Sequence, residues 1–482
     1  MDATSRKYET LALSLQALIE HNHFAAGYKL PSIRKLSEQW HYSIDTVQKA
    51  LNLLEDRGYV QPVAKSGYYV QARSTPLANT CTQAPDSIAL EPPVNLEVAN
   101  QIANFLKSST REGVAPLGVA FPAHELLPIA TLRRSYATVN RTRPDLLTLG
   151  SHVEPNQPEL VQQLQQRFEL MGMKLKRDEL VITDGCTEAL GLALQTVARH
   201  NDVVAVESPG YYLLLQMIES LGLRALEIPS SPEHGMSLEA LEIAVKQTRI
   251  AACIVCPTAS NPMGSVMPDT HRKKLLDLAE KYDFPIVEDN VYADLYFERF
   301  RPRPLKAGKQ GDRVLMCGSF SKSLSPALRI GYVAGGKYAT QVLSKKRILS
   351  GSTNPITQVA VAHYLEKGSF ERHLRTLRQQ FETQVRAMSS LVLKHFPPGT
   401  RISEPKGGFV LWVELPGDID TAALFNKAIA RKVAYMPGSV FSASGLYKNC
   451  IRLNCGHPVT DDTAVAIAKL GQLFLTQPNH LV

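Results

Sequence analysis

The chain has 482 residues, of which 44% are hydrophobic and 20% are charged, and its formal net charge is +8. This balance excludes an intrinsically disordered polypeptide, and the length predicts more than one folding unit. No apolar run approaches the roughly 20 residues that cross a bilayer, and no apolar segment follows the first few residues. We therefore expect neither a membrane anchor nor a secretion signal, and we expect a cytoplasmic protein. The positive charge permits a polyanionic partner without requiring one.

The first seventy residues begin with three predicted helices. Apolar side chains at helical spacing predict a first helix that ends before Gly27, namely Tyr8, Leu11, Leu15, Leu18 and Ile19. Ser32 is placed to cap a short second helix, and Ser43 can cap a third helix that ends near Gly58. Four apolar residues of the third helix fall on one face, and we expect them to pack inward: Ile44, Val47, Leu51 and Leu54.

Two strand-like runs follow the third helix, at residues 59–63 and 68–70. Three helices and a hairpin are typical of a winged helix-turn-helix. In that arrangement one helix enters the major groove and reads base edges with its N-terminal residues, while the hairpin meets the sugar-phosphate backbone. The same periodicity is compatible with a small helical domain that has a solvated polar face.

The motifs of residues 8–70 resemble the DNA-binding domain of the GntR family. The resemblance rests on Gly27, Leu30-Pro31-Ser32, Ser43, Thr46-Val47, Gly58-Tyr59-Val60 and Ser66-Gly67-Tyr68-Tyr69-Val70. It implies contacts with DNA phosphates and bases from six residues: Ser32, Arg34, Ser43, Thr46, Lys49 and the wing residue Lys65. The acidic Asp45 on the same helix would repel phosphate but could accept a hydrogen bond from cytosine. We therefore expect an unusual operator sequence.

A segment rich in proline, serine and threonine separates this region from the rest of the chain. It carries Pro76, Pro85, Pro92 and Pro93 and few charges, so we interpret residues 74–95 as a linker between a DNA-binding domain at residues 1–73 and a larger domain at residues 96–482. The alternative is an irregular surface loop of the larger domain.

The larger domain alternates short apolar runs with helical stretches. The strand-like runs are residues 203–206, 250–255, 284–287, 314–317 and 330–334, and the helix-like stretches include 213–221 and 269–282. This alternation predicts an α/β fold with a mainly parallel sheet. Cys253 and Cys256 lie within or beside one such run and lack a second cysteine pair of the same spacing, so we interpret them as buried strand residues and expect no metal site.

Polar residues follow several of these runs, where ligands gather in parallel sheets. Gly185 precedes a helix and would let a phosphate approach its first amides, although the motif taken alone favours an ordinary helix cap. Tyr211 presents a ring that could stack on a planar cofactor or belong to the core. Asn261 lies in a turn and could donate a hydrogen bond, and Asp289 ends a buried strand and therefore needs a cation.

A lysine follows the strand-like run at residues 314–317. Lys322 is a candidate imine former, and Arg329 follows it seven residues later. A solvated loop lysine is the alternative interpretation for Lys322 alone.

Taken in order, these motifs closely resemble the fold-type-I aminotransferases of class I and II, over residues 115–475. The resemblance implies a fold-type-I domain with a small C-terminal α+β subdomain from about residue 355 and a pyridoxal 5′-phosphate cofactor. It implies that Lys322 forms the Schiff base, that Asp289 holds the pyridine nitrogen protonated, that Asn261 and Tyr292 bond the ring oxygen, and that Tyr211 stacks on the ring. The implied phosphate ligands are Gly185, Cys186, Thr187, Ser319, Ser321 and Arg329.

Arg452 lies in a segment that resembles the part of the family that grips a substrate carboxylate. Three positions depart from the family pattern. Met263 stands where threonine is usual, Asn156 where glycine is usual, and Val161 where arginine is usual. Since the last two border the predicted site, we expect ligand access or turnover to differ.

A GntR-like head on an aminotransferase-like body resembles the MocR subfamily of regulators. The resemblance implies a homodimer that binds operator DNA and senses an amine, an amino acid or the cofactor at Lys322. The alternatives are an active aminotransferase with an accessory DNA-binding domain and a regulator whose cofactor is purely structural.

Overall fold

The computed structural model describes residues 3–20, 24, 27–56, 59–63, 66–70, 99–148 and 155–477. The chain divides into two compact units, Met1–Ala78 and Asn79–Val482. The predicted wing residue Lys65 and the predicted linker at residues 74–95 lie outside the described residues.

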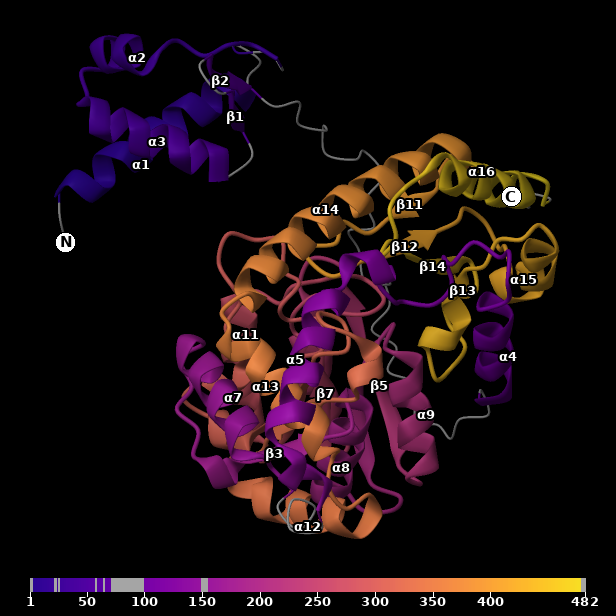
Figure 1. The fold of residues 1–482 in the computed structure, drawn as a ribbon. Coiled ribbons are helices and arrows are strands. Elements are labelled where there is room, and N and C mark those ends of the chain that lie inside the picture. Colours follow the sequence, from indigo (N-terminus) through magenta and orange to yellow (C-terminus); the bar gives the residue numbers. More distant parts are fainter. Residues whose placement is uncertain are drawn as a thin grey trace. The chain divides into compact units, whose positions relative to one another are not determined.

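The first unit has three helices followed by a two-stranded hairpin, which is the winged helix-turn-helix order (Figure 1). Its elements are α1 (Ala3–Glu20), α2 (Ile33–Trp40), α3 (Ile44–Asp56), β1 (Val60–Val63) and β2 (Gly67–Val70). Ser32 caps α2 by accepting a hydrogen bond from the Lys35 amide at 3.3 Å. His41 adopts a left-handed conformation with φ of 55° and turns the chain between α2 and α3. Leu11, Leu15, Leu36 and Leu51 are among the residues of the small apolar core.

The prediction that Ile44 packs inward is wrong, because 55% of its surface is exposed. Ile44 is the first residue of α3, and side chains on a helix point toward its N-terminus. Its side chain therefore points away from the core that buries Val47, Leu51 and Leu54 farther along α3.

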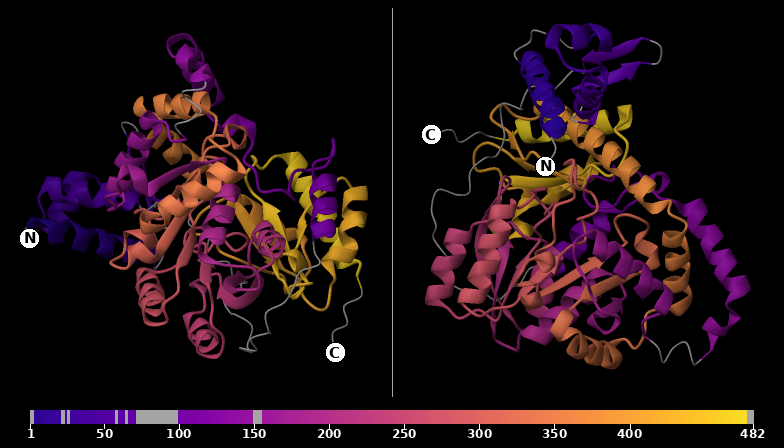
Figure 2. Two further views of the ribbon diagram at one scale, coloured as in Figure 1. Left: turned by 90° about the horizontal axis from the view of Figure 1, so that it is seen from below. Right: turned by 90° about the vertical axis from the view of Figure 1, so that its left-hand side faces the viewer.

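The second unit is built on an eight-stranded sheet with the order β3-β10-β9-β8-β7-β4-β5-β6. Figure 2 shows two further views of this sheet and the helices around it. Its strands are β3 (Leu180–Thr183), β4 (Val203–Ser208), β5 (Arg224–Ser231), β6 (Gly235–Met236), β7 (Ala252–Val255), β8 (Ile286–Asp289), β9 (Val314–Ser319) and β10 (Gly331–Ala334). β5, β4, β7, β8 and β9 pair in parallel, whereas β10 is antiparallel to both of its neighbours. The predicted mainly parallel sheet is thus confirmed.

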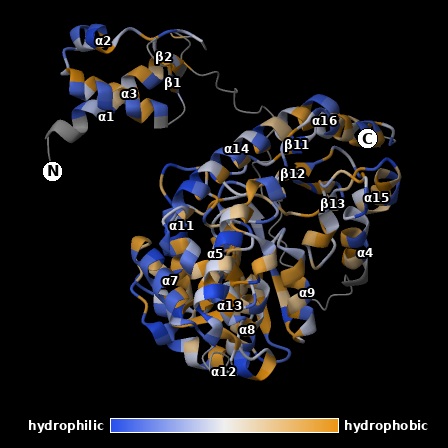
Figure 3. Ribbon diagram, in the orientation of Figure 1, coloured by the Kyte–Doolittle hydropathy of each residue, from blue (hydrophilic) through white to orange (hydrophobic). Residues whose placement is uncertain are grey.

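Helices cover both faces of this sheet, which explains why its strands are continuously apolar. On one face lie α8 (Cys186–Val197), α9 (Tyr212–Ser220) and α12 (Ala339–Leu349). On the other lie α7 (Pro158–Leu170), α10 (Leu238–Gln247), α11 (Asp269–Lys281) and α13 (Pro355–Glu366), with α5 (Ile129–Thr142) packed against α13. Figure 3 shows both hydrophobic and hydrophilic residues along these helices, whereas α13, which packs against both α5 and α7, is buried along most of its length.

The long helix α14 (Phe370–His395) leads into an antiparallel sheet of order β11-β12-β14-β13. The remaining elements there are β11 (Arg401–Ile402), β12 (Val410–Glu414), β13 (Met436–Pro437), β14 (Cys450–Asn454), α15 (Thr421–Ala430), α16 (Asp461–Leu475) and α4 (Ala99–Ser109). We call this part the C-terminal subdomain, and it has the predicted α+β class. Within the described ranges, no helix is both long and apolar enough to cross a membrane.

Candidate functional site

A cavity of about 240 Å³ opens at the carboxyl ends of the parallel strands. Ten of the predicted cofactor residues line it: Cys186, Thr187, Tyr211, Asn261, Asp289, Tyr292, Ser319, Ser321, Lys322 and Arg329. Gly185 lies directly beside it, because a β-carbon at Gly185 would be 3.0 Å from Nη1 of Arg329. The strand ends therefore bring together residues that are more than 140 positions apart in the sequence.

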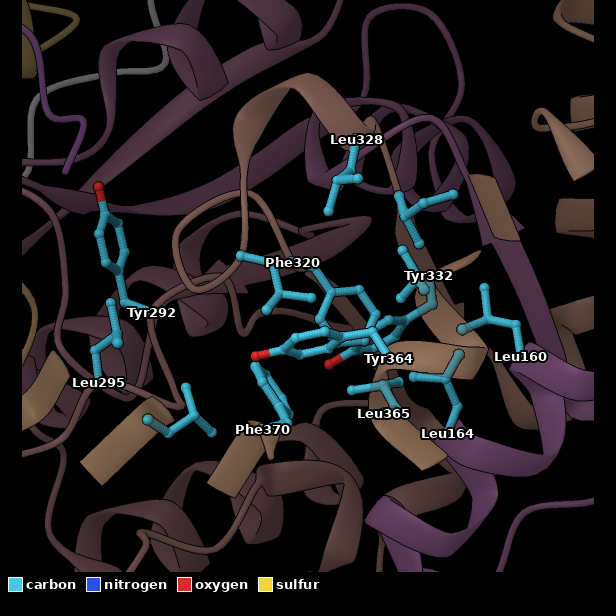
Figure 4. Close-up of a cluster of buried hydrophobic side chains, with 14 of the residues drawn as sticks. Leu160, Leu164, Tyr292, Leu295, Phe320, Leu328, Tyr332, Tyr364, Leu365 and Phe370 are labelled. Atoms are coloured by element: carbon cyan, nitrogen blue, oxygen red, sulfur yellow. The ribbon is translucent and has the colours of Figure 1, made fainter. Parts of the chain in front are cut away.

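Lys322 lies on the loop between β9 and β10. The aromatic side chain of Phe320 and those of Leu324 and Leu328 are buried in the largest apolar cluster of the unit, which fixes the loop on both sides of Lys322 (Figure 4). The Lys322 amino group donates to the Ala120 carbonyl at 2.8 Å and lies 4.2 Å from the centre of the Phe121 ring.

The surroundings of Lys322 favour a neutral amine. Burial, reinforced by the positive charge of Arg452 and opposed by Asp289, lowers the pKa of Lys322 to about 7. A neutral amine is a nucleophile, whereas an ammonium is not.

Asp289 ends β8 and is 7% exposed. Its Oδ1 accepts hydrogen bonds from the Val291 amide at 3.1 Å and from the Cys186 thiol at 3.5 Å. Burial raises the pKa of Asp289 to about 6, although these two bonds and the charge of Lys322 partly oppose the rise. The carboxylate is ionised at neutral pH and can hold a cationic ring nitrogen.

The first turn of α8 lies at one end of the cavity, beside Arg329. Gly185 precedes this turn with φ of 87°, a conformation that favours glycine. Arg329 donates to the Asp184 carbonyl, so its guanidinium lies beside the amides of that turn. Fully buried Lys346 pairs with Glu188 at 2.9 Å and thereby neutralises an acid next to the helix start.

Asn261 lies in the turn after β7, and its Oδ1 is buried without a hydrogen-bond partner among the described residues. Arg272 holds this turn by donating to the Met267 carbonyl at 2.9 Å and to the Thr258 hydroxyl at 2.9 Å. Because a buried polar group without a partner is costly, the Asn261 amide is suited to a ligand atom.

Arg452 lies on β14 and is fully buried. One of its guanidinium nitrogens donates to the Gly118 carbonyl, while Nε and Nη1 have no hydrogen-bond partner in the described part of the chain. The guanidinium carbon is 5.6 Å from the centre of the Phe441 ring. A buried cation with two unused donors is a receptor for an anion such as a carboxylate.

Several residues at the site were not predicted from sequence. Residues 115–123, which we call the strap, accept hydrogen bonds from both Lys322 and Arg452 through the Ala120 and Gly118 carbonyls. Every residue has a backbone carbonyl, so the amino-acid sequence could not show which carbonyls would accept these hydrogen bonds. Glu207 also lines the cavity and accepts from the Cys256 amide at 2.8 Å, and burial raises its pKa to about 8. The position of Glu207 at the end of an apolar run was the sequence feature that could have identified it as a site residue.

One carboxylate joins the large sheet to the C-terminal subdomain. Glu227 on β5 accepts hydrogen bonds from the hydroxyls of Ser208 at 2.8 Å, Ser442 at 3.0 Å and Ser444 at 2.8 Å, and from the Ser444 amide at 3.1 Å. We call these four residues the Glu227 cluster. Because Ser208 begins the turn that carries Tyr211, the cluster connects that turn to the segment next to Phe441.

In the DNA-binding unit the predicted contact residues have different surroundings. Arg34, Ser43 and Lys49 are exposed, whereas Thr46 is 5% exposed and its hydroxyl lies 2.8 Å from that of Ser43. Thr46 therefore has little surface left for DNA.

Two known protein families match this chain. Residues 7–70 match the bacterial regulatory proteins of the gntR family, and residues 148–469 match the aminotransferases of class I and II. The two matches fall in the two units that the structure separates.

Individual relatives match either nearly the whole chain or most of it. The chain is 36% identical to the uncharacterized HTH-type transcriptional regulator YjiR of Escherichia coli (strain K12), over 97% of this chain and 98% of that protein. It is 29% identical to aromatic-amino-acid aminotransferase 1 of Thermococcus litoralis, over 78% of this chain and 91% of that protein. Among solved structures, α-aminoadipate aminotransferase LysN of Thermus thermophilus, complexed with N-(5′-phosphopyridoxyl)-L-leucine, matches with a TM-score of 0.71 at 28% identity, over 78% of this chain and 94% of that one.

Proposed function

Because the chain belongs to the GntR-type transcriptional regulators of MocR-like architecture, with a class I and II aminotransferase domain, we propose that it is a regulator that senses an amino acid through pyridoxal 5′-phosphate. The proposal depends on one observation above all. A lysine whose pKa is about 7 and a buried aspartate line one cavity. A buried arginine with two nitrogens that have no hydrogen-bond partner among the described residues lies close enough for its charge to lower that pKa.

The residues of the cavity fit this cofactor. Lys322 would attach it covalently, Asp289 would pair with the ring nitrogen, and Asn261 with Tyr292 would bond the ring oxygen. Tyr211 would stack on the ring, and the α8 start with Ser319, Ser321 and Arg329 would hold the phosphate. The bound cofactor supplies a carbonyl carbon that amines attack and a ring that withdraws electrons.

The ligand class follows from Arg452. An amino acid offers an amine to the cofactor at Lys322 and a carboxylate to the unused Nε and Nη1 of Arg452. Lys322 and Arg452 both donate to carbonyls of the strap, Arg452 through its remaining nitrogen, so a ligand that engages these two residues binds beside the strap. Ligand binding would favour a different strap conformation, which is the differential affinity that a switch requires.

A second candidate is an active aminotransferase with an accessory DNA-binding domain. The similarity to an aromatic-amino-acid aminotransferase over 91% of that enzyme and the low pKa of Lys322 favour it. The two candidates differ in turnover and in the effect of amino acids on DNA binding.

The first experiment tests the cofactor. Borohydride reduction of the purified protein followed by peptide mass mapping should place the modification on Lys322, and Lys322→Ala should abolish it. Lys273→Ala, which changes an exposed lysine of α11, is the matched control and should leave the modification unchanged. A modification that persists in Lys322→Ala would move the attachment to another residue.

The second experiment separates sensing from catalysis. The protein should be screened against L-amino acids by cofactor absorbance, and then assayed for keto-acid formation and for binding to its upstream DNA. A regulator responds with a change in DNA affinity and at most one turnover, whereas many turnovers with no change in DNA affinity would establish the enzyme.

A further inference from the structure

An isoleucine is exposed on α3, the second helix of the helix-turn-helix, which is the helix that enters the major groove in proteins with this motif. Ile44 is 55% exposed at the first position of α3, while the other apolar side chains of α3 are buried. Val47, Ala50, Leu51 and Leu54 have no exposed surface. A large aliphatic group in the first turn of such a helix therefore has no partner within the unit's core.

The polar residues beside Ile44 are engaged with their neighbours. The Gln48 side-chain amide donates to the Tyr68 hydroxyl at 2.8 Å and to Asn52 Oδ1 at 2.9 Å, and this joins α3 to strand β2 of the wing. Thr46 is buried against Ser43. The outer surface of the first two turns is therefore presented mainly by Ile44, Asp45 and Lys49.

Asp45 and Lys49 form an ion pair of 2.8 Å, four residues apart on the helix. The pair is exposed, so it contributes little to stability, but it holds the acid and the amine side by side. The net charge of the pair is zero. Ile44 is therefore the side chain on this surface that DNA could bury favourably without supplying a charged group to pair with it.

We propose that Ile44 is a specificity-determining residue that packs against the C5-methyl group of a thymine in the operator. The thymine methyl is the apolar group that base pairs present in the major groove, and N-terminal residues of a recognition helix reach base edges there. The exposed side chain and the methyl would each lose water on contact. The proposal rests on the DNA-binding function of this unit. It adds that Ile44 recognises a thymine.

The test removes a single methyl group from the DNA. The full-length cofactor-loaded protein is used to select operators from a random duplex library, and each thymine of the selected site is then replaced by deoxyuridine. One thymine in each half-site should weaken binding by roughly fourfold when its methyl is removed, the factor expected for burial of one methyl group. Ile44→Ala should weaken binding to the thymine site by a similar factor. This variant should bind the thymine site and the uracil site with equal affinity.

Two variants serve as controls. Ile44→Val keeps a branched aliphatic side chain and should retain most of the methyl preference. Leu13→Ala removes an equally exposed side chain, also 55% exposed, from α1 and should change neither affinity nor methyl preference. Circular dichroism and binding to non-specific DNA should show that Ile44→Ala is folded.

Four outcomes would overturn the proposal. Wild-type binding that is insensitive to every thymine methyl, or an Ile44→Ala variant that keeps the methyl preference, would show that Ile44 does not read thymine. Ile44→Ala that alters the oligomeric state while keeping the methyl preference would assign the side chain to a protein contact. Failure to select any sequence would instead overturn the DNA-binding function itself, together with this proposal.

Discussion

At the residue scale, the amine of Lys322 should react at neutral pH. Its pKa of about 7 means that the neutral fraction, and hence the rate of covalent attachment of pyridoxal 5′-phosphate to cofactor-free protein, should rise about tenfold from pH 6 to pH 8 and then level off. For a lysine of ordinary pKa, the rate of attachment would continue to rise toward pH 10. Stopped-flow absorbance measures the rate, and a free amine measured alongside corrects for titration of the cofactor.

Arg452 provides a second prediction at this scale. Arg452→Met should weaken the response to amino acids by about 10- to 100-fold, the effect of losing charge-assisted hydrogen bonds, while an amine without a carboxylate keeps its affinity. Absorbance titrations with matched pairs of amino acid and amine measure both. The same variant should raise the pKa of Lys322, because the positive charge of Arg452 now lowers it. Equal losses for amine and amino acid would contradict the carboxylate role.

At the element scale, the Glu227 cluster ties the turn before α9 to the C-terminal subdomain. Glu227→Ala leaves the donors of Ser208, Ser442 and Ser444 without their acceptor, so the free energy of unfolding should fall by about 1–3 kcal/mol. Urea denaturation measures the change. Because Tyr211 follows Ser208 in this turn, the variant should also weaken amino-acid binding while keeping the covalent cofactor.

Glu169→Ala is the matched control for this element. Glu169 is an exposed acid near the end of α7, and its removal should change the free energy of unfolding by less than about 0.5 kcal/mol. If Glu227→Ala behaved like this control in both measurements, the cluster would have no role in joining the two parts of the unit.

At the scale of the whole molecule, sensing requires that the two units be thermodynamically coupled. If an amino acid changes operator affinity by some factor, operator DNA must change amino-acid affinity by the same factor, which for allosteric proteins is typically about 5- to 150-fold. Fluorescence anisotropy with labelled operator and absorbance titration of the cofactor, each with and without the other ligand, measure the two factors. If the two changes in affinity were unequal, the titrations would not be at equilibrium. If neither affinity changed, the result would favour an active aminotransferase over a sensor.

We also expect a homodimer, because its two DNA-binding units could then bind the two half-sites of an operator. Analytical ultracentrifugation with and without operator measures the stoichiometry. A monomer bound to a single half-site would remove the symmetry expected of the operator.

The sequence by itself determined the architecture and most residues of the proposed cofactor site. Apolar runs alternating with helices specified a parallel sheet, and the carboxyl ends of parallel strands lie at one edge, so Asp289 and the loop of Lys322 had to approach each other. Periodicity and the caps at Ser32 and Ser43 predicted three helices and a hairpin, and the resemblance to the GntR family identified them as a winged helix-turn-helix. These features depend on local patterns that a single sequence displays.

Only the tertiary structure decided which side chains are covered and which backbone atoms they meet. Ile44 shares an apolar periodicity with Val47 but lies beyond the edge of the core, because coverage at a helix end depends on neighbouring elements. The strap carbonyls that accept from Lys322 and Arg452 come from segments more than 200 residues from these partners, and so do Ser442 and Ser444, which meet Glu227. Such contacts are set by how distant elements pack, and no periodicity within one segment records that packing.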